Sequence, residues 1–172
     1  MEAGRREVGQ ALIDECKYRL LDESVPRLEK CLSLLGPDEI WFRPNPETVS
    51  VGNLVLHLCG NVTQWILSGL GGKRDERVRD LEFEEKGPLP VETLHRRLRD
   101  TMAETRAVLD RLDPATLLEP RRVQGFDQSA VGILVHVVEH FSYHVGQVSY
   151  TVKSRKSIDL GYYAGADLNR TD

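Results

Sequence analysis

The stretch that decides the fold reads His136-Val-Val-Glu-His140-Phe-Ser-Tyr-His144-Val-Gly-Gln147, inside a longer apolar segment, residues 127–153. The apolar residues of that segment point to most sides of a helix: Ile133, Leu134, Val137, Val138, Phe141, Val145, Val148 and Val152. A helix that is apolar nearly all round belongs in the middle of a hydrophobic core. It nevertheless carries three of the five histidines of the chain, one in each turn. The sequence therefore predicts a core helix whose imidazoles must find partners.

Two of these histidines, His140 and His144, are four residues apart and so share one face of the predicted helix. A metal ion is the partner that would use both rings at once. The pair alone is a weak signal, because a histidine on a helix is more often hydrogen-bonded to a neighbour than bound to metal. Both interpretations stay open on this evidence.

Length and composition limit the classes of protein to consider. A chain of 172 residues predicts a single domain, residues 1–172. Its 23 basic and 27 acidic residues give a net charge of −4, which argues against a nucleic-acid partner and against an anionic membrane surface. No apolar run suits a signal peptide or a spanning helix. The three cysteines, Cys16, Cys31 and Cys59, form no CxxC pair and predict buried thiols in the cytoplasm.

Hydrophobic periodicity predicts three further helices, over residues 5–35, 51–69 and 90–112. In the first of them Pro26 lacks a backbone donor, so we expect a kink or a break near Ser24. Ser50 is a good N-cap for the second helix. We find no run of useful length that alternates with the period of a strand.

The connections between these helices indicate how they pack. Adjacent antiparallel helices need only short loops, so the long connection over residues 70–89 favours a crossover between the second and third helices. We therefore expect an all-α protein, a four-helix bundle. In the loop over residues 36–49 we expect Trp41 and Phe42 to pin the chain to the core; the alternative is an exposed aromatic pair at a binding surface.

A third metal ligand must come from another helix, because sites in bundles are built from facing helices. His57 is the best candidate, since it lies near the middle of its helix. His136 competes, but three successive turns sweep about 80° around a helix, so we expect it to support a ligand or to pack. Gln147 could orient a ligand, hold water or pack. Asn53 and Asn61 flank His57 and could line a pocket, although a solvated helix face is an equal alternative.

Three neutral histidines would leave coordination positions open on a metal ion. That geometry is typical of a catalytic site, whereas a closed zinc site wants a fourth protein ligand, usually a cysteine. Cys59 is two residues from His57 and so points about 200° away from it around the helix. It cannot easily complete a closed site.

Two motifs, taken together, resemble those of the DinB-like superfamily. They are Ser50-Val-Gly-Asn-Leu-Val-Leu-His57-Leu-Cys-Gly-Asn61 and Gly132-Ile-Leu-Val-His136-Val-Val-Glu-His140-Phe-Ser-Tyr-His144-Val-Gly-Gln147. The resemblance covers nearly the whole chain and is nearest to the branch related to bacillithiol transferases. It implies a four-helix bundle in up-down-down-up order, a homodimer, and a nickel or zinc ion held by His57, His140 and His144.

The function expected from the resemblance is a low-molecular-weight-thiol S-transferase, in which the ion activates a thiol co-substrate that attacks an electrophilic small molecule. A metal-dependent hydrolase is the second choice. The alternative of another class is a non-catalytic bundle that binds metal or a small molecule. The sequence identifies no catalytic residue beyond the expected ligands, and it assigns no role to residues 154–172.

Overall fold

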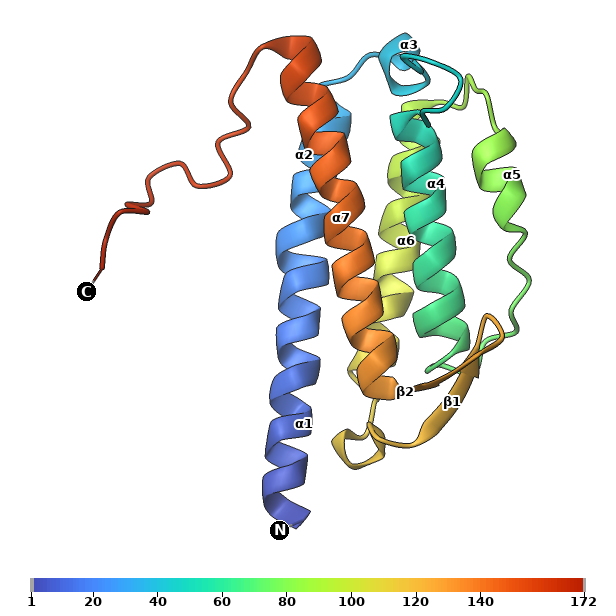
Figure 1. The fold of residues 1–172 in the computed structure, drawn as a ribbon, viewed down its shortest axis with the longest axis vertical. Coiled ribbons are helices and arrows are strands. Elements are labelled where there is room, and N and C mark those ends of the chain that lie inside the picture. Colours follow the sequence, from blue (N-terminus) through green and yellow to red (C-terminus); the bar gives the residue numbers. More distant parts are fainter. Residues whose placement is uncertain (1, 172) are drawn as a thin grey trace.

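The computed structural model describes residues 2–171 and is mostly helical, with one small two-stranded sheet (Figure 1). The elements follow in this order: α1 (Glu2–Lys17), η1 (Tyr18–Ser24), α2 (Val25–Ser33), α3 (Pro37–Ile40), α4 (Val51–Val62), η2 (Thr63–Ser68), α5 (Arg79–Glu84), α6 (Val91–Leu109), η3 (Pro114–Thr116), β1 (Pro120–Val123), β2 (Phe126–Ser129) and α7 (Ala130–Lys156). Both η1 and η2 are π-helical, and η3 is a 3-10 turn. The expected all-α class therefore holds in outline, while the hairpin, α3 and α5 lie in segments predicted as loop or connection.

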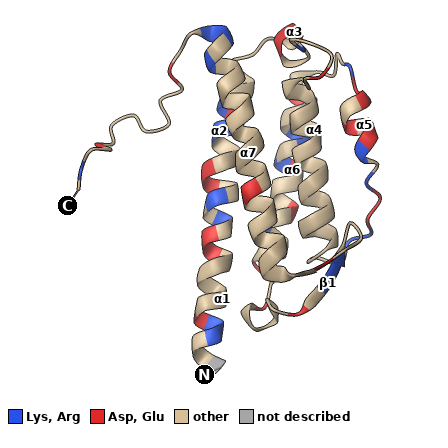
Figure 2. Ribbon diagram, in the orientation of Figure 1, with Lys and Arg blue, Asp and Glu red and all other residues tan. Residues whose placement is uncertain are grey.

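The helix predicted from the central motif is α7, and it packs against α1, η1, α2, α4 and η2. Its inner face lies in the core: Ile133, Leu134, Val137, Phe141, Val145, Val148 and Val152 are buried. The helix is not enclosed on every side, since Val135, Tyr143 and Tyr150 are exposed. Glu139 is its only charge before the basic last turn (Figure 2). The position in the core is confirmed, and one face is left open to solvent.

The first predicted helix does not break at Ser24. The chain stays helical through Tyr18–Ser24 with a widened turn, and the N–H of Val25 donates to the carbonyl oxygen of Leu20. Proline removes one backbone donor and crowds the carbonyl four residues before it. The wider π turn ahead of Pro26 accommodates that crowding without ending the helix.

The loop after α3 is anchored by Trp41 but not by Phe42. The Trp41 indole fills space that two glycines leave, because a Cβ at Gly52 would lie 2.7 Å from the ring and one at Gly87 would lie 2.5 Å from it. Phe42 is 47% exposed, with the Arg155 guanidinium 4.2 Å above its ring. The expectation that both aromatic residues reach the core is wrong for Phe42, because successive residues leave a helix end in different directions.

Two connections bring further groups beside α4 and α7. Residues 70–90 run along α4 back to the end where α4 begins, and α5 within them packs against α4 (Figure 1). The antiparallel strands β1 and β2 are joined by a tight turn in which Gln124 and Gly125 have φ of 51° and 82°. The Gln124 side chain accepts a hydrogen bond from Trp65 of η2 at 3.1 Å. Among residues 2–171, no helix is both long and apolar enough to cross a lipid bilayer.

Candidate metal centre

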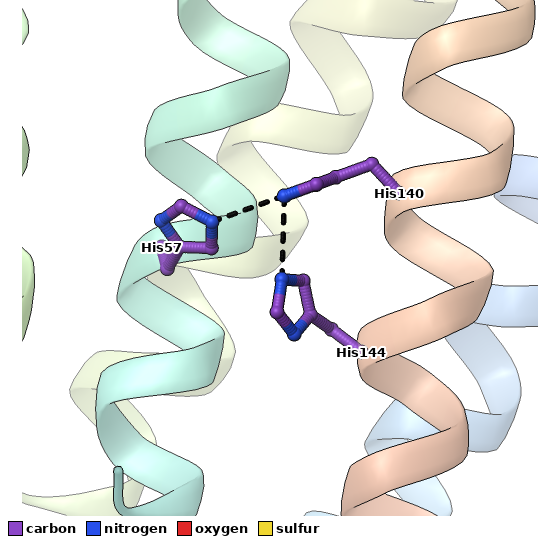
Figure 3. A group of neighbouring side chains, drawn as sticks. All are labelled: His57, His140 and His144. Carbon is purple, nitrogen blue, oxygen red and sulfur yellow. Dashed lines mark hydrogen bonds between the residues drawn. The ribbon is translucent and has the colours of Figure 1, made fainter. Parts of the chain in front are cut away.

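Three imidazoles from α4 and α7 point toward one another (Figure 3). The Nε2 atom of His57 lies 3.1 Å from that of His140, which lies 3.2 Å from that of His144. One ligand atom from each ring lies within 4.8 Å of the other two. The antiparallel course of α4 and α7 makes this possible, because His140 and His144 share a face of α7 that meets the middle of α4. The structure thus brings together the three predicted ligands in a group that could hold a metal ion.

The second nitrogen of His57 meets a carboxylate. Glu82 Oε2 lies 2.9 Å from His57 Nδ1, and both side chains are 6% exposed. Arg77 Nη2 lies 3.1 Å from the same nitrogen, but it is closer, at 2.8 Å, to Glu82 Oε2. A carboxylate can only accept, so the proton of the neutral ring belongs on Nδ1, and Nε2 carries a lone pair.

The two histidines of α7 are supported less completely. His144 Nδ1 lies 2.7 Å from Gln147 Oε1, so it donates there, and its Nε2 also carries a lone pair. His140 Nδ1 is buried and has no hydrogen-bond partner among the described residues. His140 can donate one proton through Nε2, to only one of its two neighbours. At least one close pair of nitrogens therefore faces each other with no proton between them.

A cation among the three rings would remove this repulsion. Imidazole nitrogens that bind one ion at 2.0–2.1 Å are about 3.0–3.4 Å apart, which is close to the two shorter separations here. Imidazole ligands suit zinc, nickel, copper and iron. The donor set and its tautomers therefore fit a divalent transition metal, which would keep positions open for other ligands.

Glu82 is itself fixed by a buried ion pair. Arg77 Nε and Nη2 donate to Glu82 Oε1 and Oε2, both at 2.8 Å, and the Arg77 side chain is 4% exposed. Arg77 Nη1 also donates to Gln64 Oε1 at 2.9 Å. Gly60 allows the pair to lie against α4, because a Cβ there would clash with the Glu82 carboxylate. A carboxylate that orients a ligand histidine in this way raises the basicity of the ring.

The pKa shifts favour neutral rings in the histidines of α7 and a charged Glu82. Burial, followed by the influence of His144 and His57, lowers the pKa of His140 to about 3. Burial also lowers the pKa of His144 and that of His136. For Glu82 burial raises the pKa, but the hydrogen bonds from Arg77 and His57 outweigh it and the net shift is downward. Metal binding needs unprotonated imidazoles, so these shifts favour it at neutral pH.

His136 lies one turn before His140 on α7 and does not join the group of three histidines. Its ring packs on Trp65, with centroids 3.9 Å apart, and its Nε2 lies 3.4 Å from Asn61 Nδ2. Asn61 Oδ1 is buried and has no hydrogen-bond partner among the described residues. Both residues therefore lie beside the triad, on the side toward the β1–β2 hairpin.

The other two predicted site residues have different surroundings. Gln147 holds His144 through Nδ1 and donates from Nε2 to the Tyr143 hydroxyl at 3.4 Å. Asn53 belongs to the capping box of α4, where Oδ1 accepts from the backbone and hydroxyl of Ser50. Its Nδ2 donates to the carbonyl oxygens of Glu82 and Glu85. Asn53 thus ties the crossover to the start of α4 and contributes no partner to the three histidines.

Glu82 and Arg77 were missed in the sequence because they lie in the charged connection. Nothing in that run distinguishes them from solvated charges, apart from the position of Glu82 between Leu81 and Phe83. Even that signal misleads, because Leu81 is exposed and Glu82 is buried. The contact with His57 depends on how α5 packs on α4.

Comparison with known proteins gives one result. A family described as "Protein of unknown function (DUF1572)" matches residues 7–162, which include all three histidines. The match covers most of the chain, and the chain belongs to that family. No curated protein and no solved structure matches it.

Proposed function

We propose that this member of the DUF1572 family is a divalent-metal-dependent enzyme, and that it transfers a low-molecular-weight thiol to an electrophile. The observation that carries the proposal is the set of three Nε2 atoms that face one another while Glu82 and Gln147 engage Nδ1 of His57 and His144. Within residues 2–171, no other histidine, cysteine or carboxylate joins this group. Three protein ligands leave room for substrate, as in catalytic sites.

The resemblance to the DinB-like superfamily supplies the thiol and the choice of nickel or zinc. It also supplies the assignment of the fold as an up-down-down-up four-helix bundle. Support comes from the side-by-side course of α1 with α2, α4, α6 and α7, and from the long connection between α4 and α6 (Figure 1). A reducing compartment such as the cytoplasm suits the three buried free cysteines.

The residues of the chain prepare the site for this reaction. Glu82 holds the proton of His57 on Nδ1 and so keeps Nε2 free as a ligand, while Arg77 compensates the buried charge of Glu82. Gln147 does the same for His144 from the solvent side. A bound divalent ion would supply the Lewis acidity that lowers the pKa of a thiol to near neutrality. The thiol gives up its S–H proton to water, sulfur bonds to the electrophilic carbon, and the leaving group departs with the electron pair of its bond to that carbon.

Metal analysis tests the first half of the proposal. Protein purified at neutral pH without a nickel column should contain about one equivalent of nickel or zinc per chain, and His57→Ala or His140→Ala should remove it. Adding metal back to the chelated protein should raise the melting temperature. A content below about one-tenth of an equivalent, with no change in melting, would overturn the metal site.

Thiol consumption tests the second half. The loaded protein should accelerate attack of a small thiol on 1-chloro-2,4-dinitrobenzene, followed by chloride release, and chelation or His144→Ala should abolish the acceleration. Ester hydrolysis without thiol dependence would assign a hydrolase. Metal binding with neither reaction, across cysteine, glutathione, coenzyme A and bacillithiol, would assign a non-catalytic metal-binding protein. Light scattering tests the homodimer that the resemblance implies.

A further inference from the structure

A groove continues the junction of α4 and α7 beyond the three histidines. Its volume is about 650 Å³, within the range of roughly 300–1,000 Å³ found for small-molecule sites. The side chains that line it are mostly apolar: Phe42, Val49, Val51, Leu54, Tyr143 and Tyr150. It lies between the turns of α7 that follow His144 and the segment that leads into α4.

Several side chains of the groove expose apolar surface that an occupant would bury. Phe42 is 47% exposed and Tyr150 is 75% exposed. The Arg155 guanidinium stacks on Phe42 and holds its ring in place. The surface of the groove at Gly146 is unoccupied, because no atom lies within 4 Å of the position that its Cβ would take. Burial of this surface would favour binding of an apolar group.

The groove adjoins the candidate metal centre through two side chains of α7 that contact His144, although none of the three histidines lines it. Gln147 lines the groove and is also the partner of His144 Nδ1 at 2.7 Å. Tyr143 lines it too, and its ring centroid lies 5.0 Å from that of His144. A molecule bound at an open position of the ion could therefore extend over Gln147 into the groove.

We propose that this groove binds the apolar or aromatic part of a small molecule whose polar head binds a metal ion at His57, His140 and His144. The assignment of the polar head rests on the proposed function, whereas the assignment of the apolar part rests on the groove alone. A small molecule is the occupant that fits, because the surface is concave and runs directly into the support of a ligand histidine. The substrate class is then a compound with a metal-binding group at one end and a chain or ring of several carbons at the other.

Two hydroxamic acids that share the metal-binding group and differ in the length of the alkyl chain test the proposal. Acetohydroxamic acid and octanohydroxamic acid are titrated into the cobalt(II)-loaded protein, and binding is followed by the visible bands of the ion. Octanohydroxamic acid should bind at least about tenfold more tightly, since each buried methylene contributes. In Val49→Asp and Tyr150→Ser this gain should shrink to within about twofold, while the affinity for acetohydroxamic acid and for cobalt stays unchanged.

Leu118→Ser is the matched control, because Leu118 is 68% exposed and lines another apolar groove between α1 and residues 114–119. It should leave the gain intact. The proposal would be overturned if Val49→Asp kept the full preference for octanohydroxamic acid, or if Leu118→Ser lost as much of that preference as Val49→Asp. The proposal would also be overturned if the unmodified protein bound both hydroxamic acids equally and Val49→Asp changed it from a dimer to a monomer. That result would assign the groove to contact between copies of the chain.

A metal-free experiment separates the groove from the metal centre. Saturation-transfer NMR on the chelated protein should show transfer to the octanoyl protons, weakened in Val49→Asp and unchanged in Leu118→Ser. If the protein binds no cobalt but shows this pattern, the proposed function fails and the groove stands. If it binds cobalt and the pattern is absent, the groove fails and the metal centre stands.

Discussion

The two helices that supply the candidate ligands support them in opposite ways. On α4, His57 is buried, and its Nδ1 meets a carboxylate that a buried guanidinium holds from the other side. On α7, His144 depends on the exposed amide of Gln147, and His140 Nδ1 has no hydrogen-bond partner in the part of the chain that the structure describes. One ligand is therefore fixed in place, whereas two are held mainly by their helix.

This difference separates two requirements of a metal centre. A fixed ligand defines where the ion lies. Its rigid support depends on a buried ion pair, and removing one partner of such a pair strongly destabilises the fold. Ligands with weaker support can adjust to the radius of the ion and to an incoming substrate. We expect loss of the Glu82 support of His57 to lower both stability and metal affinity, and loss of the Gln147 support of His144 to lower metal affinity alone.

Removing the carboxylate should have the largest effect. Glu82→Ala leaves Arg77 buried and unpaired, so the free energy of unfolding should fall by about 3–5 kcal/mol, measured by urea denaturation. Metal affinity, measured by chelator competition, should fall about 10–100-fold. The double variant Arg77→Met/Glu82→Leu should recover most of the stability but not the affinity. Recovery of both would show that Glu82 does not support His57.

Displacing the carboxylate without removing it should have an intermediate effect. Gly60→Ala places a methyl group where the Glu82 carboxylate lies, so the unfolding free energy should fall by about 1–3 kcal/mol and metal affinity should weaken. Gly146→Ala is the control, since nothing lies within 4 Å of its Cβ position, and it should stabilise α7 by up to about 1 kcal/mol. Equal effects of the two substitutions would contradict the close approach at Gly60.

In the metal-free protein, His140 on α7 and Glu82 beside α4 should affect the free energy of unfolding in different pH ranges. The unfolded chain binds protons on histidine below about pH 6.5, whereas folded His140 stays neutral down to about pH 3. The unfolded state therefore gains protons first, and stability is lost as the pH falls from 6.5 toward 3. The contribution of Glu82, whose folded pKa is lowered, is lost only below about pH 4.5.

Denaturation at pH 6.5, 5.5 and 4.0 measures these windows. His140→Phe should flatten the change between pH 6.5 and 5.5, and Arg77→Met/Glu82→Leu should leave that change in place. If the free energy of unfolding changed between pH 6.5 and 5.5 as much in His140→Phe as in the unmodified protein, the assignment of a neutral buried imidazole at His140 would be wrong.

The smallest effect is expected for the exposed support on α7. Gln147→Ala removes the acceptor of His144 Nδ1, so metal affinity should fall by up to about tenfold. The free energy of unfolding should stay within about 0.5 kcal/mol, because the side chain is exposed. A loss of stability as large as that of Glu82→Ala would remove the contrast between the two helices.

Local pattern predicted the helices well and the connections poorly. The apolar spacing and the Ser50 cap act within a few residues, so they are visible in sequence. Pro26 predicted a kink or a break near Ser24, and the structure shows neither an end of the helix nor a regular α-helix there but a wider π turn over Tyr18–Ser24. The hairpin escaped notice because its strands are four residues each and only Val123 among them is buried, so they are too short and too open for alternation to show.

The sequence by itself determined that His140 and His144 share one face of a helix, because helical spacing is a local property. It also indicated His57, from its place in a second apolar helix. Only the tertiary structure decided that Glu82, 25 residues from His57, would support it, and that Asn53 would serve a helix cap instead. The reason is physical: a partner distant along the chain is chosen by how α5 packs on α4, and no periodicity in the charged connection records that contact.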